Sequence, residues 1–236
     1  MSKPLIIIGA GDHAKVLLDI LLDQGEKVIG LADKSVSKGT VIYGVPVIGD
    51  DEAVLKYNAE CVELVNGIGS IGSTALREKL YGFYKTKGYV FKTVIHRSAV
   101  VSSRAVLCEG VQVLAGAVIT TEAKIGEDTV VNSNASVDHA CEIGKHCHIA
   151  PGCTLSGFVT VGDNTHIGTG SSVIQGVKIG SNVLLGAGSV VVNDIDDNSK
   201  AYGVPARMKI TKQMTGGGEL RIVYFASSSC IDEVAA

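Results

Sequence analysis

A six-residue repeat governs the second half of the chain. Starting at Ile95, every sixth residue is Ile, Val or Leu through seventeen consecutive positions, ending at Val191. Four residues after each of these lies a small or β-branched residue, such as Ala117 or Thr129. A hexapeptide repeat predicts a parallel β-helix, in which each coil stacks its apolar interior on the next.

Glycines repeat at three times this period. One ladder runs through positions 126, 144, 162 and 180, and a second consists of Gly116, Asn134, Gly152, Gly170 and Gly188. Glycine and asparagine tolerate a positive φ, so we expect both ladders to be turns that occur once per coil. Three hexapeptides per coil predict a triangular prism of between five and six coils.

The first half has a different pattern, in which short apolar runs alternate with helical spacing. This alternation predicts a small parallel α/β domain. The expected strands are residues 5–8, 27–33, 44–49, 61–69 and 89–95, and the expected helices are residues 13–25 and 73–88.

The composition argues against several functional classes. A net charge of -3 without a Lys/Arg run argues against a nucleic-acid partner. No apolar run is long enough for a signal peptide or a membrane span, so we expect no membrane association. Six cysteines without a secretory signal predict reduced thiols and a cytoplasmic location.

The stretch VDHACEIGKHCHIAPG, residues 137–152, holds three histidines and two cysteines. The repeat places Cys141, Cys147 and Cys153 at the inward small position of three successive hexapeptides. It places His146 in a column with Gly, Asp and Asn, which are typical of left-handed turns. Zinc sites require convergent Cys or His side chains, so we predict no metal here.

Two histidines of this stretch are expected to point outward. His148 lies one coil below His166, and the residues alone leave open whether the pair lines a groove or is simply solvated. His139 follows Asp138 and has Gly157 one coil above it. An imidazole base beside an open backbone N–H suits acyl transfer, although an exposed histidine without a function fits the residues equally well.

A glycine-rich loop follows the first predicted strand. The pattern G-x-G-x-x-A fits Gly9, Gly11 and Ala14, with Asp33 at the end of the second strand. This is a weak dinucleotide-binding fingerprint. Only about ninety residues precede the prism, room for one mononucleotide-binding half, and the loop suits a diphosphate equally well.

Several segments together carry a family resemblance over about residues 4–210. The chain resembles the bacterial sugar acetyltransferases, which include PglD-type and perosamine-type nucleotide-sugar N-acetyltransferases and NeuD-type sialic acid O-acetyltransferases. The segments that carry the resemblance are GAGDHA, VDHACEIG, HIAPG and AYGVPARM.

The resemblance implies a Rossmann-like nucleotide-sugar-binding domain at residues 1–93 and a left-handed β-helix at residues 94–196. A terminal loop at residues 197–213 would cap the prism, and residues 214–236 are predicted to be a flexible tail, in which IVYFA could add a strand. The family also implies a homotrimer with active sites between neighbouring prisms, and acetyl-CoA as co-substrate.

The family's functional residues map onto matching positions of this chain. His139 matches the catalytic base. The acetyl-CoA contacts would be His148, Gly157, Thr169 and Ala187, and the substrate contacts would be Gly11, Asp12, His13, Asp33, Lys34 and Gly69. The implied place of residues 11–13 is at the diphosphate of the nucleotide sugar, with His13 near it.

Two positions depart from the family pattern. Ala140 stands where the best-studied branches have Glu or Asp after the catalytic histidine, so we expect Asp138 or Glu122, one coil below Ala140, to orient His139. Asp12 replaces a common glycine, and a carboxylate beside a diphosphate is unfavourable unless it points away.

The predicted function is acetyl-CoA-dependent N-acetylation of a nucleotide-linked amino sugar, a UDP-4-amino-4,6-dideoxy sugar, in surface glycan biosynthesis. Acetylation of a hydroxyl, as on sialic acid, is the first alternative; an alcohol depends more on a base than an amine does. A zinc carbonic-anhydrase-like prism and a non-catalytic nucleotide-sugar-binding scaffold are the others.

Overall fold

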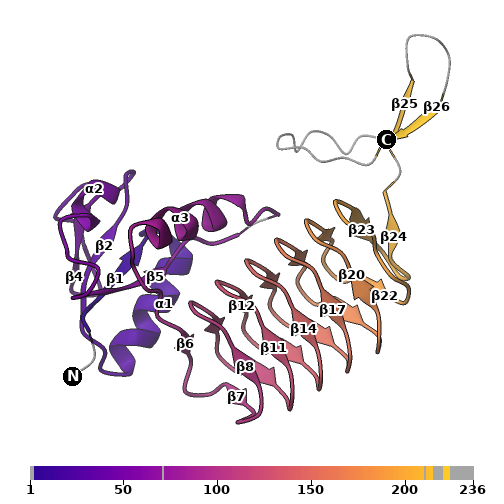
Figure 1. The fold of residues 1–236 in the computed structure, drawn as a ribbon, viewed down its shortest axis with the longest axis horizontal. Coiled ribbons are helices and arrows are strands. Elements are labelled where there is room, and N and C mark those ends of the chain that lie inside the picture. Colours follow the sequence, from indigo (N-terminus) through magenta and orange to yellow (C-terminus); the bar gives the residue numbers. More distant parts are fainter. Residues whose placement is uncertain (1–2, 71, 210, 215–219, 224–236) are drawn as a thin grey trace.

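The computed structural model describes residues 3–70, 72–209, 211–214 and 220–223. The amino-terminal part is an α/β domain and the following part is a long prism of stacked coils (Figure 1). In the described ranges no helix is long and apolar enough to cross a membrane.

The amino-terminal domain is built on a five-stranded sheet in the order β3-β4-β2-β1-β5. The pairs are parallel except for the antiparallel β3–β4 hairpin. Every residue of β1 is buried, as expected for a central strand covered on both faces. The elements are β1 (Leu5–Ile8), α1 (Asp12–Asp23), β2 (Val28–Ala32), β3 (Val41–Ile42), β4 (Val45–Gly49), α2 (Asp51–Val54), β5 (Glu63–Asn66) and α3 (Ala75–Thr86).

The predicted closing strand at residues 89–95 is wrong. Only a single bridge, between Phe91 and Leu64, joins this segment to the sheet. Tyr89 and Phe91 pack into a core cluster with Tyr81 and Tyr84, and the chain then leaves the sheet to start the prism at Val94. The strand predicted at residues 44–49 is confirmed as β4, whereas the short helix α2 and strand β3, which pairs with β4, have no counterpart in the prediction.

The prism confirms the hexapeptide prediction and has the repeat pattern of the left-handed β-helix class. Its two-residue strands follow three faces in turn. The six-stranded face contains β7 (Val100–Val101), β10 (Val118–Ile119), β13 (Ser136–Val137), β16 (Thr154–Leu155), β19 (Ser172–Val173) and β22 (Val190–Val191). The five-stranded face contains β8 (Val106–Leu107), β11 (Lys124–Ile125), β14 (Glu142–Ile143), β17 (Thr160–Val161) and β20 (Lys178–Ile179).

The eight-stranded face carries the amino-terminal domain and extends to the end of the prism. It contains β6 (Val94–Ile95), β9 (Gln112–Val113), β12 (Val130–Val131), β15 (His148–Ile149), β18 (His166–Ile167), β21 (Leu184–Leu185), β23 (Lys200–Tyr202) and β24 (Arg207–Met208). The last pair, β23–β24, is antiparallel. Beyond it, β25 (Thr211–Met214) pairs with β26 (Leu220–Val223), which covers part of the predicted IVYFA strand; residues 215–219 and 224–236 of the predicted tail lie outside the described residues.

Partners are 18 residues apart from β6 to β22, as for Ile119 and Val137, whereas the last coil is shorter and pairs Leu184 with Lys200. The repeat residues fill a continuous core in which Ile125 and Leu155, for example, are fully buried. Ile95 is 38% exposed because no complete coil lies below it. One register therefore holds from Ile95 to Val191, the range over which the sequence predicted it, and it changes only in the last coil.

Three corners separate the faces, and each contains one column of positive-φ residues. The His139 corner, between the six- and five-stranded faces, has positive φ at residues 122, 140, 158 and 176. The Thr169 corner, between the eight- and six-stranded faces, has the ladder that begins at Gly116, and the Asp128 corner has positions 110, 128, 146, 164 and 182. These findings confirm the turn predictions for His146 and for the second glycine ladder.

The ladder at positions 126, 144, 162 and 180 has a different cause. None of these glycines has a positive φ, so the turn prediction is wrong for this ladder. A Cβ on Gly126 would come within 2.5 Å of the carbonyl carbon of Gly144, and one on Gly162 within 2.5 Å of Ser181 N. Glycine is required here because successive coils approach too closely for a side chain.

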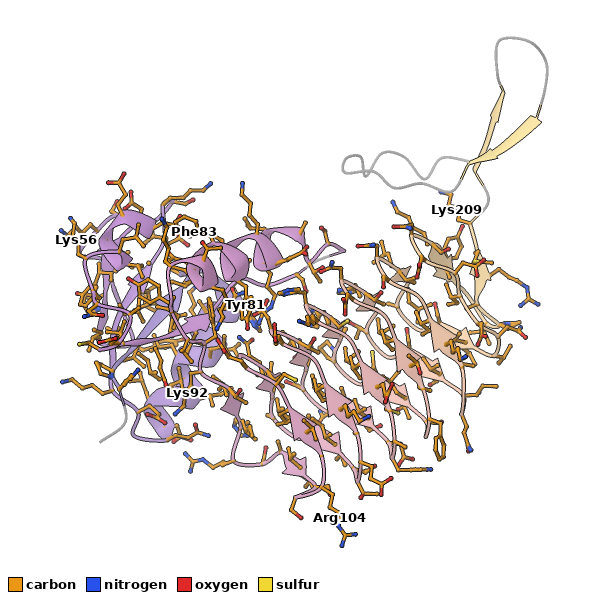
Figure 2. All side chains as sticks on the ribbon, in the orientation of Figure 1. Lys56, Tyr81, Phe83, Lys92, Arg104 and Lys209 are labelled. Atoms are coloured by element: carbon orange, nitrogen blue, oxygen red, sulfur yellow. The ribbon has the colours of Figure 1, made fainter. Side chains whose placement is uncertain are left out.

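The two domains meet through buried polar groups. Arg77 of α3 forms an ion pair of 2.7 Å with Asp128, and both side chains are almost fully buried. Tyr81 of the same helix stacks on Phe91 and meets His146 edge to face. Figure 2 shows Tyr81 where α3 approaches the first coils. These contacts hold the amino-terminal domain against the Asp128 corner and the eight-stranded face.

Candidate active site

His139 lies at a corner of the prism with a carboxylate beside its ring. Asp138 Oδ1 lies 2.9 Å from His139 Nδ1 and also accepts hydrogen bonds from the His139 backbone N–H at 2.7 Å and from Thr120 Oγ1 at 3.0 Å. The bond to the His139 side chain, followed by the bonds from the His139 backbone and Thr120, lowers the pKa of Asp138. The carboxylate is therefore ionised and held in place.

This arrangement fixes the imidazole tautomer. A carboxylate can only accept, so Nδ1 carries the hydrogen that it donates to Asp138. Nε2 is then the free, basic nitrogen of the neutral ring. The side chain is 44% exposed, so a substrate can approach it. His139 has the geometry of a general base with an orienting carboxylate.

Gly157 leaves the space that the His139 ring occupies. A Cβ at this position would lie 2.5 Å from His139 Nε2 and 2.9 Å from Nδ1. Among the described backbone hydrogen bonds, the Gly157 N–H has no acceptor. A free N–H donor beside a base can stabilise the oxyanion of an acyl-transfer intermediate.

The two carboxylates predicted for His139 are placed differently. Asp138 contacts the ring, whereas no described hydrogen bond joins Glu122 to His139. Glu122 and Ala140 occupy successive turn positions of the same corner, with φ of 62° and 55°. Phe158, the next residue in this column, contacts the His139 ring edge to face at 5.2 Å.

His148 is not the exposed imidazole expected from the sequence. The residue is only 9% exposed because the segment around Ser70 covers it. Ser70 Oγ lies 2.5 Å from Nδ1, and Asn132 Nδ2 lies 2.9 Å from Nε2. Burial, then the neighbouring His166, lowers the pKa of His148 to about 3, so the ring is neutral.

The other predicted cofactor contacts lie at a second corner. Thr169 and Ala187 are exposed and occupy equivalent positions in successive coils of the Thr169 corner. This corner and the His139 corner are the two edges of the six-stranded face. Gly157 is on one edge, and Thr169 and Ala187 are on the other.

The glycine-rich loop leads into the amino terminus of α1. Gly11 is the N-cap of this helix and no side chain accepts a capping hydrogen bond there, so the first N–H groups of the helix are not satisfied by a cap. Asp12 points away from the helix end: its side chain is 98% exposed and pairs with Lys15 at 3.0 Å. The carboxylate therefore leaves the helix amino terminus open.

His13 and Gly69 face each other beside this loop, since a Cβ on Gly69 would lie 3.3 Å from His13 Cβ. Asp33 accepts hydrogen bonds from the backbone N–H groups of Ala10, at 2.9 Å, and Ser35, at 2.7 Å. Its carboxylate thus ties the loop to the end of β2. Lys34 is exposed at the same end of the sheet.

Several residues at the domain junction had no sequence signal. The side chain of Gln112 contacts His13, and Asn66 and Arg77 contact Asp128. Each is a polar residue at a position where only the docking of the two domains creates a buried environment. No spacing in the sequence could identify them.

The three inward cysteines are structural. Cys141, Cys147 and Cys153 are fully buried, and each thiol donates to a carbonyl oxygen of the next coil. Burial raises the pKa of Cys147 to about 12, so its thiol stays protonated. In the part of the chain that the structure describes, no group of three His, Cys, Asp or Glu side chains could hold a metal ion.

The candidate residues form two groups on different sides of one chain. The His139 corner lies opposite the eight-stranded face, which carries His148 and contacts the amino-terminal domain. Figure 2 shows Arg104, in the first coil of the His139 corner, projecting from the side of the prism opposite α3. A single chain therefore separates His139 from the loop at residues 11–13.

Comparison with known proteins matches both halves of the chain. Residues 4–82 match the PglD N-terminal domain, and residues 122–157 and 158–193 match the bacterial transferase hexapeptide family. The search of curated protein sequences gives no match.

Two solved structures are similar over nearly their whole length. PerB from Caulobacter crescentus, in complex with CoA and GDP-perosamine, is 40% identical, with 87% of this chain and 97% of that chain covered and a TM-score of 0.81. The acetyltransferase domain of PglB from Neisseria gonorrhoeae, in complex with acetyl coenzyme A, is 31% identical, with 89% and 100% covered and a TM-score of 0.82.

Proposed function

Since this chain belongs to the acetyltransferase family that joins a PglD-type amino-terminal domain to hexapeptide repeats, we propose that it transfers acetyl from acetyl-CoA to the amine of a nucleotide-linked amino sugar. The observation that carries the proposal is the His139–Asp138 pair beside the open backbone of Gly157. The structures of similar proteins with CoA and a nucleotide sugar support it.

In the proposed reaction, the sugar amine attacks the thioester carbonyl and a carbon–nitrogen bond forms. His139 Nε2 accepts the proton that the nitrogen loses, while Asp138 stabilises the imidazolium. The Gly157 N–H donates to the oxyanion. Collapse of the intermediate breaks the carbon–sulfur bond, and the CoA thiolate takes the proton from His139.

We propose that the working unit is a homotrimer, because one chain keeps the two groups of residues apart. The outward residues of the six-stranded face are small and uncharged, from Val100 to Val190, whereas Lys124 and Glu142 lie on the five-stranded face. Packing the uncharged faces around a threefold axis would bring the His139 corner of one chain beside the Thr169 corner of the next.

The proposed acetyl-CoA groove lies between those two corners. Gly157 would contact the acyl end, with Thr169 and Ala187 of the neighbouring chain further along the groove. His148 lies on the adjoining eight-stranded face beneath Ser70. Both ring nitrogens of His148 have partners, Ser70 and Asn132, so the buried, neutral ring would support the wall of the groove rather than contact the cofactor's phosphates.

The amino-terminal domain is the proposed site for the nucleotide sugar. The backbone of residues 11–13 and the amino terminus of α1 would bind the diphosphate. Asp33 holds this loop through Ala10, and Lys34 and Gly69 lie at the same edge of the domain. The Asp12 carboxylate points away from the helix amino terminus and so does not repel the diphosphate.

The first experiment identifies which nucleotide and which sugar the protein accepts. The sequence suggests a UDP-4-amino-4,6-dideoxy sugar, and the complex of PerB with GDP-perosamine makes a GDP-linked amino sugar the second candidate. Purified protein is assayed with acetyl-CoA against UDP-, dTDP- and GDP-linked amino sugars and against sialic acid. Acetylation of an amino sugar at nitrogen supports the proposal, and turnover of sialic acid alone contradicts it.

Subunit mixing tests the shared site. We expect His139→Ala and a variant with the 11–13 loop disrupted to be inactive alone and to regain activity when co-assembled, because some sites then hold both intact halves. Absence of recovery in mixed trimers contradicts a site built from two chains.

A further inference from the structure

Gln112 connects the prism to the substrate side of the amino-terminal domain. It lies on β9 and is 1% exposed. Its amide Nε2 donates to Asn66 O at 2.7 Å, and its Oε1 lies 2.8 Å from His13 Nε2. The predicted substrate residue His13 is therefore held by a side chain from the other domain.

The orientation of the Gln112 amide is fixed by its partners. Asn66 O is a carbonyl and can only accept, so the amide nitrogen must face it. Arg77 Nη1 also donates to Asn66 O at 3.1 Å, and the Asn66 side chain donates to Asp128 at 3.0 Å. The ion pair between Arg77 and Asp128 thus holds the carbonyl that orients Gln112.

A fixed Gln112 sets the tautomer of His13. Gln112 Oε1 can only accept, so His13 Nε2 must carry the hydrogen. Burial, followed by the positive charge of Arg77, lowers the pKa of His13 to about 4, which keeps the ring neutral. Nδ1 is then an acceptor, and among the described residues it has no hydrogen-bond partner.

We propose that Gln112 is a positioning residue that presents His13 Nδ1 as a hydrogen-bond acceptor to an O–H or N–H group of the sugar. This inference rests on the proposed function and adds the part of the substrate that His13 contacts. A diphosphate offers only acceptor oxygens at neutral pH, so a neutral Nδ1 acceptor does not bind it. The backbone of residues 11–13 binds the diphosphate, and the His13 side chain binds the sugar.

Binding measurements separate the sugar from the diphosphate. Calorimetry compares the accepted nucleotide amino sugar with its nucleoside diphosphate alone, for wild type, His13→Gln and Gln112→Ala. We expect both variants to weaken binding of the amino sugar by about tenfold, the loss of one hydrogen bond, and to change binding of the nucleoside diphosphate less than about twofold. Equal weakening of both ligands overturns the proposal.

His13→Asn is the conservative variant. The amide of Asn reaches the position of Nδ1, whereas that of Gln reaches the position of Nε2. We expect His13→Asn to retain binding of the amino sugar within about threefold of wild type, because its oxygen replaces the acceptor. A His13→Gln protein that binds the sugar better than His13→Asn contradicts the assignment.

Gln24→Ala is the matched control. Gln24 also joins the two domains, by donating to Ile95 O at 2.6 Å, but it does not contact His13. We expect this variant to bind both ligands as wild type does. Weakened sugar binding in Gln24→Ala contradicts a specific role of Gln112 and indicates a general effect of domain docking.

Nitrogen NMR of the imidazoles provides a test that does not depend on activity. Wild type is expected to show His13 in the Nε2–H tautomer at pH 7, with the signal assigned by its loss in His13→Asn. In Gln112→Ala we expect both tautomers. The proposal is overturned if the wild-type His13 ring is doubly protonated, or if it carries its single hydrogen at Nδ1, even when the protein acetylates an amino sugar. Absence of turnover alone contradicts only the proposed function.

Discussion

The ring of His139 fills the space that a side chain at Gly157, one coil above it, would occupy. A Cβ there would lie 2.5 Å from His139 Nε2, well inside van der Waals contact. Gly157 does not have a positive φ, so backbone strain does not require glycine at this position. At the His139 corner, the absence of a side chain at Gly157 therefore leaves room for the imidazole and exposes a backbone N–H.

Gly157→Ala tests this relationship. The added methyl group displaces the imidazole, so we expect kcat to fall by at least about a hundredfold, the scale of general-base catalysis, with a near-wild-type Tm. Gly25→Ala is the control, because Gly25 has a φ of +75° and open space around it. That variant should lose about 1 kcal/mol of stability and keep its activity. An active Gly157→Ala enzyme contradicts the placement of His139.

Asp138 is expected to be the carboxylate that supports His139. Asp138→Ala removes the group that holds the ring and stabilises the imidazolium, so we predict a fall in kcat of about 10- to 100-fold and a displaced acid limb of the pH–rate profile. Glu122→Ala, one coil below Ala140, should retain the wild-type profile because Glu122 makes no described bond to His139. If the pH–rate profiles of both single variants and of the double variant match wild type, neither carboxylate supports His139.

The buried ion pair between Arg77 and Asp128 is expected to hold the two domains together. Asp128→Asn keeps a residue that tolerates the φ of 55° but removes the charge that compensates Arg77. We expect the free energy of unfolding to fall by about 3 to 5 kcal/mol, measured by chemical denaturation.

The matched control for this pair lies on the surface. Lys124 and Glu142 form an ion pair of 2.8 Å with side chains 64% and 58% exposed. Lys124→Ala should change the free energy of unfolding by less than about 1 kcal/mol. If Asp128→Asn and Lys124→Ala lower the free energy of unfolding by similar amounts, burial does not make the Arg77–Asp128 pair more important than a surface pair.

Stability should depend on pH through the buried histidines. Burial lowers the pKa of His13 to about 4 and that of His148 to about 3, against 6.5 in the unfolded chain. Between these values the unfolded state binds more protons, so stability falls as the pH decreases below 6.5, by up to about 1.4 kcal/mol per pH unit for each histidine.

Thermal unfolding at pH 7.0 and 5.5 measures this effect. His148→Asn should reduce the difference in Tm between the two pH values, because asparagine does not titrate. His96→Asn is the control, because within the described residues the His96 ring is hydrogen-bonded to Ser98 alone. An undiminished difference in His148→Asn would contradict the assignment of the effect to His148.

The periodic part of the fold could be predicted from the sequence. The positions of Ile125 and Cys147 inside the prism follow from a period of six, and the turn at His146 follows from a period of 18. Each depends on contacts between equivalent positions in neighbouring coils, so the repeat itself carries the information. The pairing of His139 with Gly157 was predictable for the same reason.

The contacts between the domains could not be predicted. His148 was expected to be exposed because its hexapeptide position faces outward, but the chain around Ser70 covers it. Gln112 and Asn66 are joined through a docking surface that has no period in the sequence. The glycine ladder at Gly126 was assigned to turns because a glycine signal does not distinguish a positive φ from a close approach of backbones.

The rate of acetyl transfer by His139→Ala tests the central claim most directly. Wild type and variant are compared on the accepted nucleotide amino sugar with saturating acetyl-CoA, and the product is identified by mass spectrometry. We predict that wild type forms the N-acetylated sugar and that His139→Ala, with an unchanged Tm, is slower by about 10² to 10⁴. A variant as fast as wild type would contradict the assignment of His139 as the catalytic base.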